Sequence, residues 1–100
     1  MILYINTKDQ KKVIVSLKKD GEVVATQTEE NGFGSQVLLP LIEKVLKQEN
    51  LEYKDLKGIE VETGPGSFTG LRVGVSVANA LGFSLKIPVN GKKSETELVY

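Results

Sequence analysis

Apolar and polar residues along the first third of the chain are arranged in a pattern that predicts three strands. Residues 2–5 are all apolar, which is typical of a strand buried on both faces. Residues 12–18 alternate between apolar and polar and predict a half-buried strand. Asp20-Gly21 can supply the positive φ angles of a tight turn, so residues 22–28 should return as a third strand. The polar residues 29–32 then predict a loop.

Helical periodicity appears twice in the rest of the chain. A first helix is expected from Ser35, a suitable N-cap, to about Glu49, and a second from about Ser67 to Leu85. Between them, residues 58–63 alternate and predict a fourth strand, and the sequence Ile-Pro-Val at residues 87–89 predicts a short fifth strand. The first helix has a broad apolar stripe made of Val37, Leu38, Leu41, Ile42, Val45 and Leu46, which Leu39 widens.

The order of these elements, β-β-β-α-β-α-β, defines the expected fold class. A hairpin followed by crossover helices predicts an α/β fold with a mixed five-stranded sheet and helices on its faces. This is the topology of a ribonuclease H-like or actin-like (ASKHA) subdomain. One hundred residues suffice for a single domain with one modest core, so residues 1–100 are expected to form one domain.

The composition argues against several classes of function. Thirteen basic residues balance thirteen acidic ones, so no bulk positive charge predicts strong direct binding of nucleic acid. Cysteine and histidine are both absent, which removes thiolate chemistry and the commonest general base at neutral pH. The apolar N-terminal run is too short for a signal peptide, and no span is judged to approach membrane length. The expectation is a cytoplasmic protein without membrane contact.

The segment Gly-Pro-Gly-Ser-Phe-Thr-Gly-Leu-Arg-Val-Gly at residues 64–74 is the most informative motif. It follows a predicted strand and opens the second helix, where backbone amides could hold a phosphate. The alternative is that Gly64 and Gly66 shape the turn and Ser67 caps the helix. The loop has no lysine and no acid at ribose spacing, so it completes neither a P-loop nor a dinucleotide fingerprint. We name residues 64–69 the signature turn: Gly64, Pro65, Gly66, Ser67, Phe68 and Thr69.

Small residues recur every four positions along the second helix. They are Gly70, Gly74, Ala78 and Gly82. A glycine inside a helix is about 1 kcal/mol less favourable than alanine, so close approach of another backbone should offset this. That neighbour is either the chain's own sheet and first helix or a partner chain.

Acidic residues offer only a weak metal-site candidate. Glu60 and Glu62 would share one strand face, an arrangement that is more often a solvated surface than a metal site. A nuclease with two metal ions needs a carboxylate cluster led by the first strand, and Asn6 occupies that position. No catalytic residue, metal or cofactor is therefore expected.

The segment at residues 64–74, together with Leu39-Pro40 and residues 87–89, resembles the TsaB (YeaZ) family of tRNA threonylcarbamoyladenosine biosynthesis proteins. The resemblance covers nearly the whole chain in order. It implies a pair of ribonuclease H-like subdomains and a non-catalytic protein that binds TsaD, the threonylcarbamoyl transferase, through two N-terminal helices. The implied partners are TsaD and the ATPase TsaE, which together modify the adenosine beside the anticodon.

The sequence departs from the family pattern at three places. Asn6-Thr7-Lys8 stands where the family usually has Asp-Thr, and Gly34 stands where histidine is frequent. The sequence reaches Tyr100, about where the second family domain would begin, so only the N-terminal half is expected and the second domain is expected to be absent. Residues 94–97 resemble a capping box that would open a further helix.

Three functional hypotheses follow from the motif and the resemblance. The first is a TsaB-type scaffold that activates TsaD in a heterodimer, the second a homodimeric interaction module derived from the family. The third, a residual nucleotide-binding domain, is disfavoured by Asn6 and by the missing second domain. The expected partner surface combines the first helix with the glycine face of the second: Leu38, Leu39, Ile42, Val45, Gly70, Arg72, Gly74 and Ala78.

Overall fold

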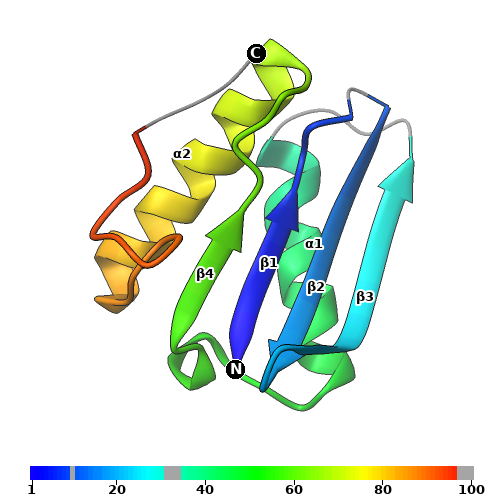
Figure 1. Cartoon of the computed structure of the whole chain (residues 1–100). Coiled ribbons are helices and arrows are strands. Elements are labelled where there is room, and N and C mark those ends of the chain that lie inside the picture. Colours follow the sequence, from blue (N-terminus) through cyan, green and yellow to red (C-terminus); the bar gives the residue numbers. More distant parts are fainter. Residues whose placement is uncertain (10, 31–34, 97–100) are drawn as a thin grey trace.

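Four strands form a mixed sheet in the order β3-β2-β1-β4 (Figure 1). The computed structural model describes residues 1–9, 11–30 and 35–96. β1 is antiparallel to β2 and parallel to β4, and β2 is antiparallel to β3. The strand bounds are β1 (Ile2–Asn6), β2 (Lys12–Lys19), β3 (Glu22–Glu30) and β4 (Gly58–Val61).

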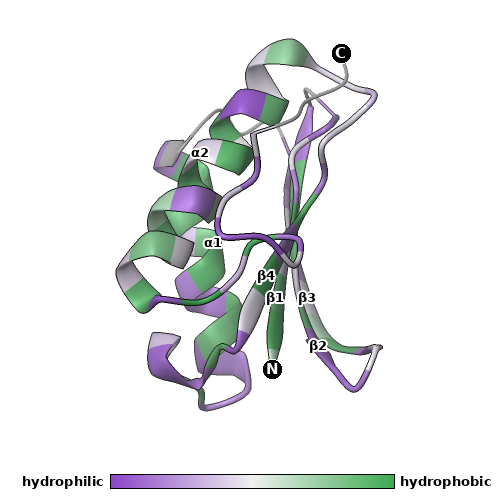
Figure 2. Ribbon diagram, turned by 60° about the vertical axis from the view of Figure 1, so that its left-hand side comes forward, coloured by the Kyte–Doolittle hydropathy of each residue, from purple (hydrophilic) through white to green (hydrophobic). Residues whose placement is uncertain are grey.

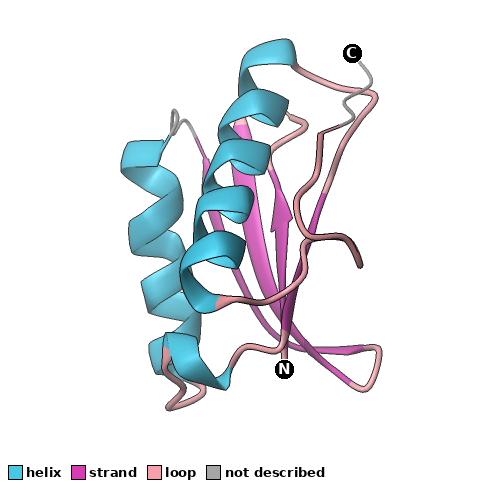
Figure 3. Ribbon diagram, turned by 90° about the vertical axis from the view of Figure 1, so that its left-hand side faces the viewer, coloured by secondary structure: helices cyan, strands magenta, loops and turns pink. Residues whose placement is uncertain are grey.

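Both helices lie on the same face of this sheet (Figure 3). They are α1 (Ser35–Gln48) and α2 (Phe68–Leu85), and a short 3₁₀ helix, η1 (Tyr53–Asp55), precedes β4. Helices were expected on both faces of the sheet, and this expectation is not met by the described residues. We call the face without a described helix the open face. Figure 2 shows hydrophobic residues along β1 and β4 and at intervals along the two helices beside them.

The core fills the space between the sheet and the helices. Leu3 and Ile5 of β1 point to the helices and are fully buried, whereas Ile2 and Tyr4 lie on the open face and are only half-buried. The prediction that this strand is buried on both faces is therefore wrong, because both helices of the described residues lie on its other face. The other fully buried large side chains are Leu17, Leu38, Ile42, Ile59, Leu71, Val15, Val45 and Val89.

Local turn chemistry explains the β2–β3 hairpin. Asp20 and Gly21 have φ angles of 52° and 83°, which are the left-handed values that a two-residue hairpin turn needs. The predicted hairpin is thus confirmed. β3 runs two residues further than expected, to Glu30, because Glu29 and Glu30 still pair with Val13 and Lys12.

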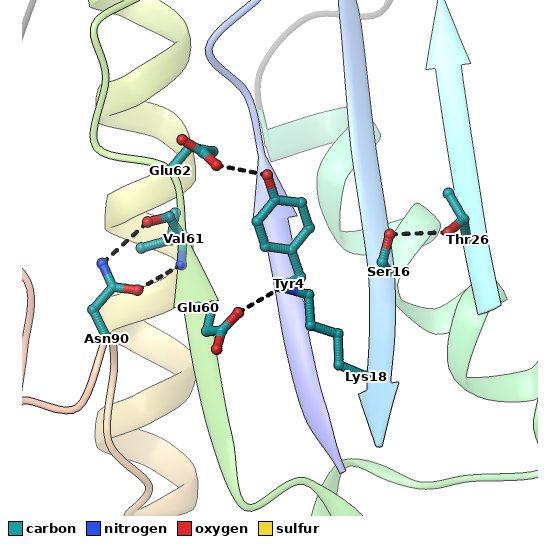
Figure 4. Close-up of polar contacts among 8 residues, drawn as sticks. All are labelled: Tyr4, Ser16, Lys18, Thr26, Glu60, Val61, Glu62 and Asn90. Atoms are coloured by element: carbon teal, nitrogen blue, oxygen red, sulfur yellow. Dashed lines mark hydrogen bonds and ion pairs between the residues drawn. The ribbon is translucent and has the colours of Figure 1, made fainter. Parts of the chain in front are cut away.

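The predicted fifth strand is reduced to two isolated bridges of Val89, a parallel one with Ile59 and an antiparallel one with Lys92. Pro88 has no amide hydrogen, and Asn90 and Gly91 adopt left-handed φ angles of 52° and 75° that turn the chain back at once. The Asn90 side chain makes the two hydrogen bonds to β4 that the backbone of a continuing strand would make. Its Oδ1 accepts from the Val61 amide at 2.8 Å and its Nδ2 donates to the Val61 carbonyl at 3.0 Å (Figure 4).

The segment after this turn is fastened to α2. The Asn79 side chain donates to the Glu95 carbonyl and accepts from the Glu95 amide, both at 2.7 Å. Ser94 to Thr96 are not helical in the structure. The remainder of the helix expected from residue 94 onward, residues 97–100, lies outside the described residues.

By length and composition alone, α2 could cross a membrane, with a mean hydropathy of 1.2 over 18 residues. The expectation that no span approaches membrane length is thus not met by this helix. In the folded chain α2 contacts β1, β4 and α1, and Leu71, Val75 and Ala78 are buried. Core helices of proteins that never enter a membrane pass the same test, so the finding is weak evidence for a membrane span.

Candidate partner-binding site

The signature turn joins the carboxyl end of β4 to α2 beside the end of β1. Ser67 is the N-cap of α2, and its hydroxyl accepts from the Gly70 amide at 3.3 Å. The Ser67 amide itself donates to the Lys8 carbonyl at 2.8 Å, which fixes the turn against the segment after β1. The predicted cap is confirmed. Gly64 has a φ of 111°, a conformation that favours glycine.

The glycines of α2 allow this helix to approach the segment after β1. A Cβ atom at Gly70 would overlap the Thr7 carbonyl oxygen, and one at Gly74 would overlap the Thr7 hydroxyl. The Thr7 hydroxyl donates to the Gly70 carbonyl at 2.5 Å, and Thr7 is buried. At the other end of α2, a Cβ at Gly82 would lie 2.6 Å from a methyl carbon of Val89. The close neighbour of the glycine face is therefore this chain's own sheet.

The residues expected to bind a partner separate into two groups. Those whose side chains or backbone lie inside the chain's own core are Leu38, Ile42, Val45, Gly74 and Ala78. Leu39, 40% exposed, and Arg72 lie on the surface, and Gly70 is half-buried against Thr7. A partner could reach Leu39 and Arg72 directly, and their role in partner binding stays a prediction.

Part of the accessible surface of α2 is a shallow hollow. It has a volume of about 200 Å³ and is lined by Arg72, Val73, Ser76 and Val77. The Arg72 guanidinium, which lines the hollow, lies over the Phe68 ring at 5.3 Å from its centroid. Val73 and Val77 also contact the core, so the hollow has a rigid apolar floor.

A second hollow lies along α1. Its volume is about 260 Å³, and its lining mixes apolar with polar side chains: Glu29, Gln36, Val37, Pro40, Leu41 and Lys44. Leu39, adjacent in sequence to this lining, is one of the exposed large hydrophobic residues. Because Glu29 belongs to β3, this hollow lies where α1 meets the edge strand of the sheet.

Val73, Ser76 and Val77 were missed by the reasoning from sequence. We expected the partner to contact the glycine face of α2, but in the structure that face packs against Thr7. The available signal was the neighbouring set of positions 69, 73, 77 and 81, which carries two valines and a leucine at four-residue spacing. Two apolar stripes on one helix indicate that one of them is accessible.

The open face of the sheet carries a cluster of paired charges (Figure 4). The Tyr4 hydroxyl donates to Glu62 at 2.7 Å, and Lys18 contacts Glu60 at 2.8 Å and lies 4.6 Å from the centre of the Tyr4 ring. Burial and the hydrogen bond to Glu62 raise the pKa of Tyr4 to about 12. Both glutamates are therefore engaged by side chains of this chain. No group of three metal-ligating residues occurs among the described residues.

The end of β1 holds the residues that differ from the family pattern. The Asn6 side-chain oxygen accepts from the Lys8 amide at 3.1 Å, which forms a local turn. The Lys8 ammonium lies 4.0 Å from the Glu62 carboxylate. The Thr7 hydroxyl donates to the Gly70 carbonyl of α2. This corner is arranged for packing the signature turn. Gly34, the second departure, lies outside the described residues.

Comparison with known proteins identifies relatives of this fold. The family described as "TsaD: tRNA N6-adenosine threonylcarbamoyltransferase" matches residues 19–94. The tRNA threonylcarbamoyladenosine biosynthesis protein TsaB of Bacillus subtilis is 33% identical over 93 residues, and that of Buchnera aphidicola from Schizaphis graminum is 44% identical over 54 residues. YeaZ from Pseudomonas aeruginosa superposes with a TM-score of 0.78 at 28% identity over 88% of this chain.

The chain is much shorter than these relatives. The alignments cover 93% and 54% of this chain but 41% of the Bacillus protein and 26% of the Buchnera protein. The superposition covers 40% of the Pseudomonas protein. The chain thus spans between about a quarter and two fifths of the length of the relatives it matches. The mixed α/β fold is shared with YeaZ. The sheet of this chain has four strands among the described residues, where five were predicted.

Proposed function

The chain belongs to the TsaD family and is of the TsaB (YeaZ) type, and from this premise we propose that it is a non-catalytic subunit that binds and activates a TsaD-type transferase. The transferase completes the threonylcarbamoyladenosine modification of tRNA, with a TsaE-type ATPase as a further partner. In this role the chain works in the cytoplasm. It contributes a surface and no reacting group.

The apolar outward side of the two helices is the observation that carries this proposal. Leu39 on α1 and the hollow formed by Val73, Ser76 and Val77 on α2 lie on the same layer of the molecule. A short side chain at Ser76 between two valines can admit the ridge of a partner helix, because side chains of packed helices interdigitate. Arg72 at the rim can pair with a partner carboxylate.

The non-catalytic role is supported by how the polar residues are used. Histidine and cysteine are absent from the sequence. Glu60 of β4 pairs with Lys18, and Glu62, the residue after β4, accepts a hydrogen bond from the Tyr4 hydroxyl. Asn6 stands in place of the acid that the superfamily's enzymes use and is bonded to the Lys8 amide. These polar side chains are thus bonded within the chain, and the described residues hold no group of three metal-ligating side chains.

A charge placed in the hollow of α2 tests the proposal. Ser76 is exposed, so Ser76→Arg should leave the fold intact and fill the space that a partner helix needs. We expect co-purification with the TsaD-type transferase of the same organism to fall at least about tenfold, which corresponds to about 1.4 kcal/mol. Thr28→Arg is the matched control, because Thr28 is an exposed position on β3 away from the helix layer.

Different outcomes separate the proposal from its alternatives. If Ser76→Arg co-purifies with the transferase as well as the unaltered chain does, the hollow of α2 is not part of the interface. A homodimer that Ser76→Arg dissociates, with no binding of the transferase, would favour the stand-alone interaction module. Calorimetric binding of ATP by the chain alone would revive the nucleotide-binding reading.

A further inference from the structure

The last turn of α2 and the segment after it enclose a hollow that the proposed function does not use. This region lies at the orange end of α2 in Figure 1. The hollow has a volume of about 570 Å³, and its described lining contains three lysines and no acidic residue. Its lining is Gly82, Phe83, Lys86, Ile87, Pro88, Gly91, Lys92 and Lys93.

Phe83 supplies an aromatic surface to this hollow. It is 83% exposed, the highest value among the exposed large hydrophobic residues that the structure describes. Because an exposed phenylalanine ring keeps apolar surface in water, a ligand that covers the Phe83 ring at the edge of the hollow gains free energy from burying it. The core side of α2 is formed by other residues, including Leu71, Val75 and Ala78, so Phe83 is not needed for packing.

The charge of this region differs from that of the whole chain. Residues 63–94 contain no acidic residue but include Arg72, Lys86, Lys92 and Lys93, although the chain as a whole is neutral. Lys92 pairs with Glu95 at 3.0 Å. Lys86 and Lys93 make no ion pair with a described residue and therefore give the hollow a positive potential.

The walls of the hollow are held in place before any ligand binds. Lys86 caps α2 in a left-handed conformation, and its amide donates to the Gly82 carbonyl. The Asn90–Gly91 turn is fastened to β4 by the two hydrogen bonds between Asn90 and Val61. A preformed site loses little conformational freedom on binding.

We infer that this hollow binds single-stranded RNA, with one base stacked on Phe83 and adjacent phosphates beside Lys86 and Lys93. An aromatic ring bordered by ammonium groups is the combination that single-stranded nucleic acids use, because each base has a flat face and each linkage a negative charge. An acidic protein segment would use the lysines but would not need the ring. The choice of RNA rests in part on the proposed function, which brings the chain to tRNA.

Fluorescence anisotropy with a labelled single-stranded RNA of about ten nucleotides tests the inference on this chain alone. Phe83→Ala should weaken binding by at least about fivefold, since stacking of one base contributes about 1–3 kcal/mol. Lys93→Gln and Lys86→Asn each remove one charge, and asparagine tolerates the left-handed conformation at residue 86. Together the two changes should make the slope of the logarithm of the association constant against the logarithm of the salt concentration shallower by about 1.4. Lys12→Gln, at the opposite end of the sheet, is the control and should change neither quantity (Figure 1).

Three results would overturn the inference. One is no binding at about 1 mM chain, tenfold above weak non-specific dissociation constants of about 10⁻⁴ M. Another is equal binding by Phe83→Ala and the unaltered chain. The third is equally tight binding of polyglutamate, which would assign the hollow to an acidic protein. If RNA binding persists but Ser76→Arg and the unaltered chain bind the transferase equally, only the helix interface of the proposed function fails.

Discussion

The contact between Thr7 and Gly74 makes a quantitative prediction about how α2 is seated. A Cβ atom at residue 74 would overlap the hydroxyl of buried Thr7, which donates a part-buried hydrogen bond to the Gly70 carbonyl. The change Gly74→Ala therefore forces the Thr7 side chain to rotate or α2 to move away. Either adjustment breaks the hydrogen bond or loosens the packing of the helix on β1.

The magnitude follows from three opposing contributions. Replacing a helix-interior glycine with alanine stabilises by about 1 kcal/mol. Overpacking costs about 1–3 kcal/mol, and leaving a buried hydroxyl without its partner costs about 1–3 kcal/mol. We expect Gly74→Ala to lower the free energy of unfolding by about 1–5 kcal/mol, whereas Ser84→Ala, at an exposed position of the same helix, should raise it by a few tenths.

A double-mutant cycle followed by urea denaturation, with circular dichroism as the signal, isolates the contact. Thr7→Ala alone removes the hydroxyl and should destabilise by about 1–2 kcal/mol. In Thr7→Ala/Gly74→Ala the new methyl group enters the space that the hydroxyl leaves, so the double variant should be more stable than the sum of the single effects by at least about 1 kcal/mol. Gly70→Ala is the contrast, because its Cβ meets the Thr7 backbone carbonyl and Thr7→Ala should not rescue it. Additive effects at residues 7 and 74 would refute the proposed seating of α2.

Three further predictions concern local contacts. Asn90→Gly keeps the left-handed turn but loses both hydrogen bonds to Val61, so it should lower the free energy of unfolding, measured in urea, by about 1–3 kcal/mol. Asn90→Ala should lower it by about 1 kcal/mol more, because alanine is strained in the left-handed conformation. Equal stability of Asn90→Gly and the unaltered chain would contradict this prediction. Ser67→Ala removes the N-cap of α2 and should lower the urea midpoint by an amount equivalent to about 1 kcal/mol, whereas Ser84→Ala should not. The pKa of Tyr4 is raised in the folded chain to about 12 from about 10, so the stability that Tyr4 contributes is complete below pH 10 and is lost as the pH rises to 12. Tyr4→Phe should flatten the fall in urea midpoint across that window, and an unchanged fall would contradict the raised pKa of Tyr4.

Local sequence signals predicted most of the elements because their causes are local. Asp20-Gly21 requires only its own left-handed conformation to form the hairpin, and Ser67 requires only the adjacent helix to act as a cap. The end of the sheet could not be predicted in this way. Residues 87–89 read as a strand, but the Asn90 side chain takes over the hydrogen bonds of β4, which requires knowing that Asn90 lies beside Val61.

The candidate site was predicted only in part, for the same reason. Spacing identified the glycine face of α2 and the need for a close neighbour, but a stripe of small residues does not reveal what it packs against. The structure places Thr7 and Val89 there. The spacing of Val73 and Val77 indicates a second apolar stripe on α2, but only the structure shows which of the two stripes is accessible.

The most direct test of the central claim is light scattering with size-exclusion chromatography on this chain mixed with the TsaD-type transferase of its own organism. The proposed function predicts a new complex of defined stoichiometry that Ser76→Arg weakens and Thr28→Arg does not. Separate elution of the two proteins at micromolar concentration, with the chain folded by circular dichroism, would contradict the claim that this chain is a transferase-binding subunit.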